Sequence, residues 1–92
     1  MRPLQQAIPG ALTEILRAAP LSDGKVGFAW RTAVGPAVER ATAVKLVHRV
    51  LIVETASPQW SQEIMRSSPL ILRRLQHLLG PSVVEAIEVR RA

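Results

Sequence analysis

The sequence predicts an α+β domain in which helices pack on one face of a small three-stranded sheet. Residues 43–55, AVKLVHRVLIVET, are rich in the β-branched residues that strands favour. Apolar residues recur at helical spacing before and after this run. Two Ser-Pro pairs, Ser57-Pro58 and Ser68-Pro69, have the composition of helix starts, because serine caps free amides and proline is tolerated at the first helical position.

Length and composition indicate one small domain. The chain has 92 residues, 48% of them hydrophobic, so we expect a single domain over residues 1–92, with residues 1–8 as a loose N-terminus. There is no cysteine, which fits a reducing compartment. No apolar run approaches the roughly 20 residues that a membrane span requires. We therefore expect a cytoplasmic protein that does not interact with membranes.

The charge balance favours anionic partners. Lysine and arginine number 12 against 7 acidic residues, which gives a net charge of +5 at pH 7. Most of the cations are arginines, whose planar fork suits phosphate or carboxylate. The alternative is a small domain that is merely basic, and composition does not separate the two.

Two helices are expected in the first part of the chain. Residues 3–19 have apolar side chains at helical spacing, the firm part beginning near Pro9 and the end marked by Pro20. A second helix follows Ser22 or Asp23 as its N-cap. It ends at Gly35-Pro36, and its apolar stripe consists of Val26, Ala29, Trp30, Ala33 and Val34.

The middle of the chain reads as two strands, at residues 43–47 and 50–55, that turn at His48-Arg49. This turn is atypical. Neither residue is Gly, Asn or Asp, so the tight hairpin turns that require positive φ are disfavoured.

The two Ser-Pro pairs predict two helices, at residues 58–66 and 69–79, closed by Gly80-Pro81. The final segment, SVVEAIEVRR, predicts a third strand in which Ile87 and Val89 face one way and Glu88 and Arg90 the other. The predicted order is therefore α-α-β-β-α-α-β. Without its first helix, this is the order of a type II KH domain, a nucleic-acid-binding fold.

In a KH domain a Gly-x-x-Gly loop joins the two helices before the last strand. Here that position holds Arg66-Ser67-Ser68-Pro69, so close clamping of a nucleic-acid backbone is not expected. The two serines and the following helix N-terminus could bind one phosphate, although a simple helix cap is the favoured interpretation. A literal Gly-x-x-Gly occurs at Gly24–Gly27, where a turn that leads into a capped helix is favoured.

Trp30 and Trp60 both lie on apolar stripes, which favours core packing over base stacking. With 3% aromatic residues the chain has few stacking platforms. Any binding of single-stranded DNA should therefore be weak, mainly electrostatic and sensitive to salt.

The best candidate binding surface is a cationic face on the helices at 58–79, joined by cations of the hairpin and the last strand. An ordinary solvated face is an equally good interpretation, and the arginines suit an acidic protein surface as well as DNA. The candidate residues for nucleic-acid or partner binding are Arg66, Arg73, Arg74, Lys45, Arg49 and Arg90, with Arg91 as a further possibility.

Catalysis has little support in the sequence. His48 and His77 lack carboxylates at the spacing of metal ligands or of a catalytic triad. No Walker-type phosphate loop is present. We therefore expect no enzyme activity, no metal and no cofactor.

At several positions the sequence resembles a known family. The matching features are Trp30, the VGP of residues 34–36, the VLIV of residues 50–53, Ser57 with Trp60 and the QE of residues 62–63, then LRRL and the LGP of residues 79–81. In this order and spacing the sequence is similar, over about residues 3–90, to the DciA family of bacterial replicative-helicase loaders. The resemblance implies a KH-like domain that binds the DnaB-type helicase hexamer and assists its loading onto single-stranded DNA.

Two departures from the family pattern stand out. Many family members carry a long basic extension, whereas this chain ends at Ala92, so a loading activity that depends on such a tail is not implied. Many relatives also place Asp-Gly or similar residues in the hairpin, where this chain has His48-Arg49.

Two other functions compete with the one that the resemblance implies. One is a KH-like RNA-binding or ribosome-associated protein, which would prefer structured RNA to single-stranded DNA. The other is a purely protein-binding or self-associating module without salt-dependent nucleic-acid binding.

Overall fold

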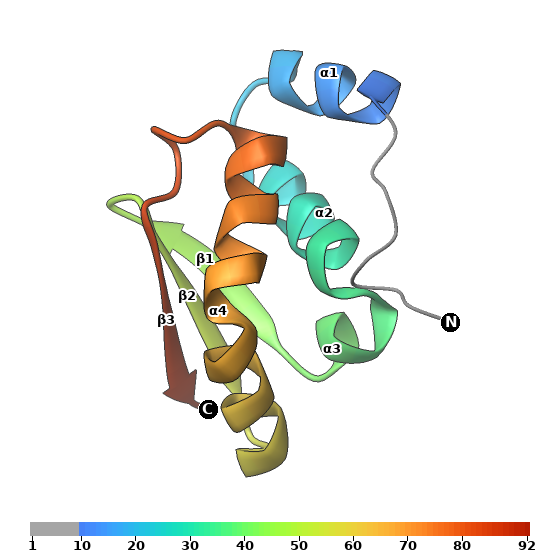
Figure 1. Cartoon of the computed structure of the whole chain (residues 1–92). Helices are drawn as coiled ribbons and strands as arrows, with labels where there is room; N and C mark the ends of the chain where they lie inside the picture. The colour runs from blue at the N-terminus through green and yellow to red at the C-terminus, as the bar shows by residue number, and fades with distance from the viewer. Residues whose placement is uncertain (1–9) are drawn as a thin grey trace.

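The chain folds into a layer of helices and one small sheet (Figure 1). The computed structural model describes residues 10–92. In chain order its elements are α1 (Gly10–Ala18), α2 (Asp23–Val34), α3 (Pro36–Arg40), β1 (Ala43–Val47), β2 (Val50–Thr55), α4 (Pro58–Leu79) and β3 (Ala86–Arg91).

The three strands form one sheet in the order β1-β2-β3. β1 and β2 are antiparallel neighbours, whereas β2 and β3 are parallel. A parallel pair needs a long crossover connection, which α4 supplies. In this register Lys45 lies opposite Ile52, and Ile52 lies opposite Glu88. These three side chains therefore point to the same side of the sheet.

The helices cover one face of the sheet, and the hydrophobic core lies between the two layers (Figure 1). Leu51 and Val53 of β2 point into it and are fully buried. Trp30 of α2 and Leu75 of α4 meet them from the helical layer. The core also includes Leu16, Val26, Ala29, Ala33, Val34, Ile64, Ile71, Leu78, Leu79 and Val84.

Several predicted elements are confirmed. α1 and α2 lie within the predicted segments, and the hydroxyl of Ser22 caps α2 by accepting a hydrogen bond from the N–H of Lys25 at 3.1 Å. In β3, Ile87 and Val89 are half-buried, while Glu88 and Arg90 are exposed.

α4 is one continuous helix of 22 residues, so the predicted division into helices 58–66 and 69–79 is wrong. Pro69 lies in the helix interior, where its ring nitrogen cannot donate to the carbonyl of Met65. The buried Ile64 and Ile71 are seven residues, or about two turns, apart. The apolar stripe thus stays in phase across Pro69, and burial of that stripe outweighs one missing hydrogen bond.

A short helix, α3, lies between the end of α2 and the start of β1, where no helix was predicted. Gly35, with φ of 89°, ends α2 as predicted, and Pro36 is the first residue of α3. Proline suits that position, because the first helical amide has no partner within the helix.

The hairpin between β1 and β2 has a tight two-residue turn, contrary to the expectation from its composition. His48 and Arg49 have φ angles of 48° and 68°, the signs that a type I′ turn requires. Each left-handed non-glycine residue costs about 1–2 kcal/mol. The N–H of Glu85 donates to the carbonyl oxygen of Arg49 at 2.7 Å, so a contact outside the hairpin helps to hold this conformation.

The predicted α+β class, with helices on one face of a three-stranded sheet, is confirmed. The order of helices and strands also fits the KH-like assignment in outline, and that assignment stays a prediction. The loose N-terminus expected at residues 1–8 lies outside the described residues. In residues 10–92 no helix has the length and apolar character that a membrane span requires.

Candidate nucleic-acid and partner interface

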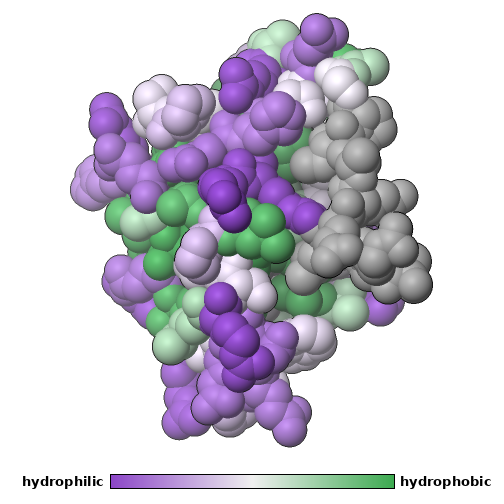
Figure 2. Space-filling view, in the orientation of Figure 1, coloured by the Kyte–Doolittle hydropathy of each residue, from purple (hydrophilic) through white to green (hydrophobic). Residues whose placement is uncertain are grey.

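The outward face of α4 carries two of the predicted arginines. Arg66 and Arg73 are seven residues apart, so both project from the exposed side of the helix. Arg74 is half-buried and lies further round the helix. Figure 2 shows hydrophilic surface over much of α4, with hydrophobic patches between the charged groups.

Three of the predicted cations lie beside a carboxylate. Arg66 Nη1 lies 2.6 Å from Glu63 Oε1, and Arg49 Nη1 lies 3.4 Å from Glu85 Oε1. Arg90 pairs with Glu88. All three pairs are exposed, so each contributes about 0–1 kcal/mol to stability at most. Their main effect is to lower the positive charge that these positions present.

Arg73 and Arg74 have no such partner among residues 10–92. Arg17 of α1 binds the last turn of the same helix, α4: its Nε donates to the carbonyl oxygen of His77 at 2.9 Å. Its Nη2 donates to the carbonyl oxygen of Gln76 at 3.3 Å. We call Arg17, Arg73, Arg74 and His77 the helix-end cluster.

Sequence reasoning missed Arg17. Its place at the end of α4 depends on how α1 packs across that helix, and no local pattern shows a contact between residues 60 positions apart. A cation at a helix C-terminus is favourable because the last carbonyls carry partial negative charge. Arg17 thus stabilises α4 and brings a third arginine to its end.

Lys45 and Arg90 are not part of this cluster. They lie on the face of the sheet turned away from the helices, in the same rows as Glu54 and Glu88. Two cations and two carboxylates share that face, so its charges balance. The structure therefore divides the predicted surface between two sides of the sheet, with Arg49 at the hairpin tip and Arg91 at the end of β3.

The segment Arg66–Pro69 offers no phosphate loop. Because α4 is continuous, no helix begins at Pro69, and no free N-terminal amides are available there. Both interpretations of this segment are therefore wrong: Ser68 caps no helix start, contrary to the favoured interpretation, and the alternative phosphate site has no free amides. Gly24 and Gly27 lie within α2 and not in a turn before it, so the Gly-x-x-Gly pattern there is helical.

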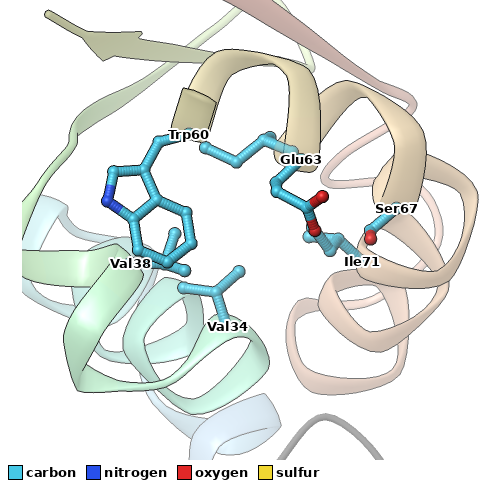
Figure 3. A pocket seen from close by; sticks show the side chains of 7 residues that line it. Val34, Val38, Trp60, Glu63, Ser67 and Ile71 are labelled. Carbon is cyan, nitrogen blue, oxygen red and sulfur yellow. The ribbon is translucent and has the colours of Figure 1, made fainter. Parts of the chain in front are cut away.

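Trp30 packs in the core, as predicted. It is 1% exposed, and its indole Nε1–H donates to Thr42 Oγ1 at 2.9 Å. Trp60 is half-buried and lies at the rim of a hollow between α4 and the helices α2 and α3 (Figure 3). Val34 and Val38 face Trp60 across this hollow, with Glu63 and Ser67 on the α4 side.

The exposed arginines of the helix-end cluster are suited to electrostatic binding. Within residues 10–92, His, Asp and Glu side chains form no group of three or more that could hold a metal ion. The cations of the helix-end cluster lie on the surface, where they can reach phosphate or carboxylate groups.

Comparison with known proteins identifies the family to which the chain belongs. The family described as Dna[CI] antecedent, DciA, matches residues 3–89. No curated protein and no solved structure matches the chain. The match spans nearly the whole chain and includes all of the helix-end cluster, so the family resemblance predicted from the sequence is confirmed. The chain belongs to the DciA family, a family of helicase-loading accessory proteins rather than a class of enzymes.

Proposed function

We propose that this protein is a non-enzymatic replication accessory module that binds the DnaB-type helicase hexamer and, weakly, single-stranded DNA, and so assists helicase loading. The family match over residues 3–89 is the observation that carries this proposal. The mechanism is positional, because the protein would hold helicase and strand near each other without a reaction of its own.

The helix-end cluster supports the part of the proposal that concerns DNA. Its three arginines come from two helices and are not neutralised by carboxylates within the described residues. Few phosphates can be contacted by so small a group, so the affinity should be weak. Each phosphate contact on a single strand contributes about 0.7 to the slope of log K against log salt.

The part that concerns the helicase rests on the family. The net charge of +5 favours an acidic surface on the partner, and arginine binds carboxylates through the same planar fork that it offers to phosphates. The helicase contact and the DNA contact can therefore compete for the same arginines.

Two measurements test the proposal. The purified protein should co-elute with the DnaB-type hexamer of its own organism on a sizing column without DNA. Fluorescence anisotropy with a labelled oligo(dT) should show binding that weakens steeply between about 50 and 200 mM salt. Failure to co-elute at micromolar concentration would remove the helicase from the proposal.

An RNA competitor serves as the control for nucleic-acid class. If structured RNA displaces oligo(dT) at much lower concentration than unlabelled oligo(dT) does, the protein is an RNA binder and the DNA part of the proposal is wrong. If neither competitor nor salt changes the anisotropy, the protein does not bind nucleic acid electrostatically.

A further inference from the structure

The tip of the β1–β2 hairpin is strained and exposed. His48 and Arg49 both have positive φ angles, 48° and 68°, and both side chains are accessible to solvent. Asn-Gly or Asp-Gly would adopt this turn at lower cost. Strained backbone held by surrounding contacts is typical of binding sites, where particular side chains are needed in spite of the strain.

Contacts with the segment before β3 hold this tip. The N–H of Glu85 donates to the carbonyl oxygen of Arg49 at 2.7 Å, and the Glu85 carboxylate lies 3.4 Å from Arg49 Nη1. This ion pair lowers the positive charge of Arg49, but it engages one nitrogen of the guanidinium and both side chains are largely exposed to solvent. A guanidinium has five N–H donors, which leaves Arg49 able to bind a second anion.

Hydrogen bonds connect the tip to the helix-end cluster. Val84 precedes Glu85, and its carbonyl oxygen accepts a hydrogen bond from Gln76 Nε2 at 3.1 Å. The carbonyl oxygen of Gln76 in turn accepts from Arg17 Nη2. The hairpin tip and the C-terminal end of α4 therefore lie at the same end of the molecule (Figure 1).

We propose that the hairpin tip is a second contact for the nucleic-acid strand bound by the helix-end cluster, with Arg49 on a phosphate and the His48 ring stacked on a base. This inference rests on the DNA part of the proposed function. Single-strand binders combine flat rings for bases with cations for the backbone, and the tip presents one of each on adjacent residues. At protein–protein interfaces, the residues that contribute most of the binding energy are typically Trp, Tyr and Arg that lie in well-packed pockets. A convex two-residue tip offers no such pocket, so the strand is favoured over an acidic protein surface.

The test replaces the tip by a turn of the same type without strain. The double variant His48→Asn with Arg49→Gly should raise Tm by several degrees and lower the affinity for a labelled oligo(dT) of about 15 nucleotides by about 3- to 10-fold. Arg31→Ala is the matched control, because it also removes one positive charge but lies exposed on α2. It should change the affinity less than twofold.

A second pair of variants separates the two roles. His48→Ala should weaken binding of oligo(dT) but not of an abasic oligonucleotide with the same number of phosphates. Arg49→Gly should weaken binding of both. If His48→Ala weakens both equally, or neither, the stacking part of the inference is wrong.

The remaining outcomes are distinct. A double variant with raised Tm and with an affinity equal to that of Arg31→Ala would show that the tip does not contact the strand. A double variant that keeps its DNA affinity but no longer co-elutes with the helicase would place the tip in the helicase contact and overturn the proposal. If the wild-type protein binds no oligonucleotide at about 50 mM salt, the inference fails together with the DNA part of the function, whereas co-elution still tests the helicase part.

Discussion

The indole Nε1–H of Trp30 donates a hydrogen bond to Oγ1 of Thr42 at 2.9 Å. Thr42 immediately precedes β1, and its own hydroxyl donates to the carbonyl oxygen of Val38 at 2.8 Å. One hydroxyl thus joins α2, α3 and the start of the sheet. Because Trp30 is 1% exposed, water cannot easily replace this acceptor.

Thr42→Val should therefore destabilise the fold. Valine has nearly the shape of threonine but leaves the buried indole N–H without an acceptor, which costs about 1–3 kcal/mol. Urea denaturation measures the change. Thr32→Val is the control, because within residues 10–92 the Thr32 hydroxyl donates only to the carbonyl oxygen of Phe28 in its own helix, and its loss should cost less than about 0.5 kcal/mol. Equal midpoints for the two variants would show that the Trp30 hydrogen bond contributes nothing.

Pro69→Ala should stabilise the protein. Proline in a helix interior removes one hydrogen bond and strains the preceding turn at a cost of about 3 kcal/mol or more, and Pro69 is exposed, so alanine loses little packing. We expect a gain of about 2–3 kcal/mol in the free energy of unfolding. Pro36→Ala is the control, because Pro36 is a first helical residue and its replacement should give no such gain. A loss of stability on Pro69→Ala would contradict the continuous helix.

The sequence predicted most of the fold because the signals were local. Ser57-Pro58 marked the start of α4, and the run of β-branched residues marked β1 and β2. Ser68-Pro69 has the same local signature as Ser57-Pro58. However, Ile64 and Ile71, before and after Pro69, lie on the same buried side of α4, and one continuous helix buries both. Local rules gave a helix start at Ser68-Pro69, whereas packing gives a continuous helix.

The candidate site was less predictable than the fold, because part of it depends on tertiary contacts. Arg66 pairs with Glu63, three residues earlier on the same helix, a contact that helical spacing indicates, whereas Arg73 has no ion-pair partner within the described residues. The sequence marks Lys45 and Arg90 as surface cations, but strand register places them on the same face of the sheet as Glu54 and Glu88. Arg17 reaches α4 only through the packing of α1.

Arg17→Ala should weaken both stability and DNA binding. Loss of its hydrogen bonds to the last turn of α4 should cost about 0.5–1.5 kcal/mol, as measured by urea denaturation. Arg17→Lys keeps the charge but cannot reproduce the two-donor contact with the carbonyls of Gln76 and His77. The lysine variant should therefore recover more of the DNA affinity than of the stability. Full recovery of stability by lysine would show that charge alone acts at this helix end.

The strongest test of the helix-end cluster compares two double variants that remove the same charge. Arg73→Ala with Arg74→Ala removes two cations without carboxylate partners in residues 10–92, whereas Arg66→Ala with Arg90→Ala removes two that are paired. The first variant should flatten the slope of log K against log salt by about 1.4, which corresponds to two lost phosphate contacts on a single strand. The second should change the slope by less than about half that amount, because Arg66 and Arg90 are expected to make no phosphate contact of their own. Their removal also frees the carboxylates of Glu63 and Glu88, which repel the strand. If both variants flatten the slope equally, net charge controls the binding and the helix-end cluster is not a distinct site.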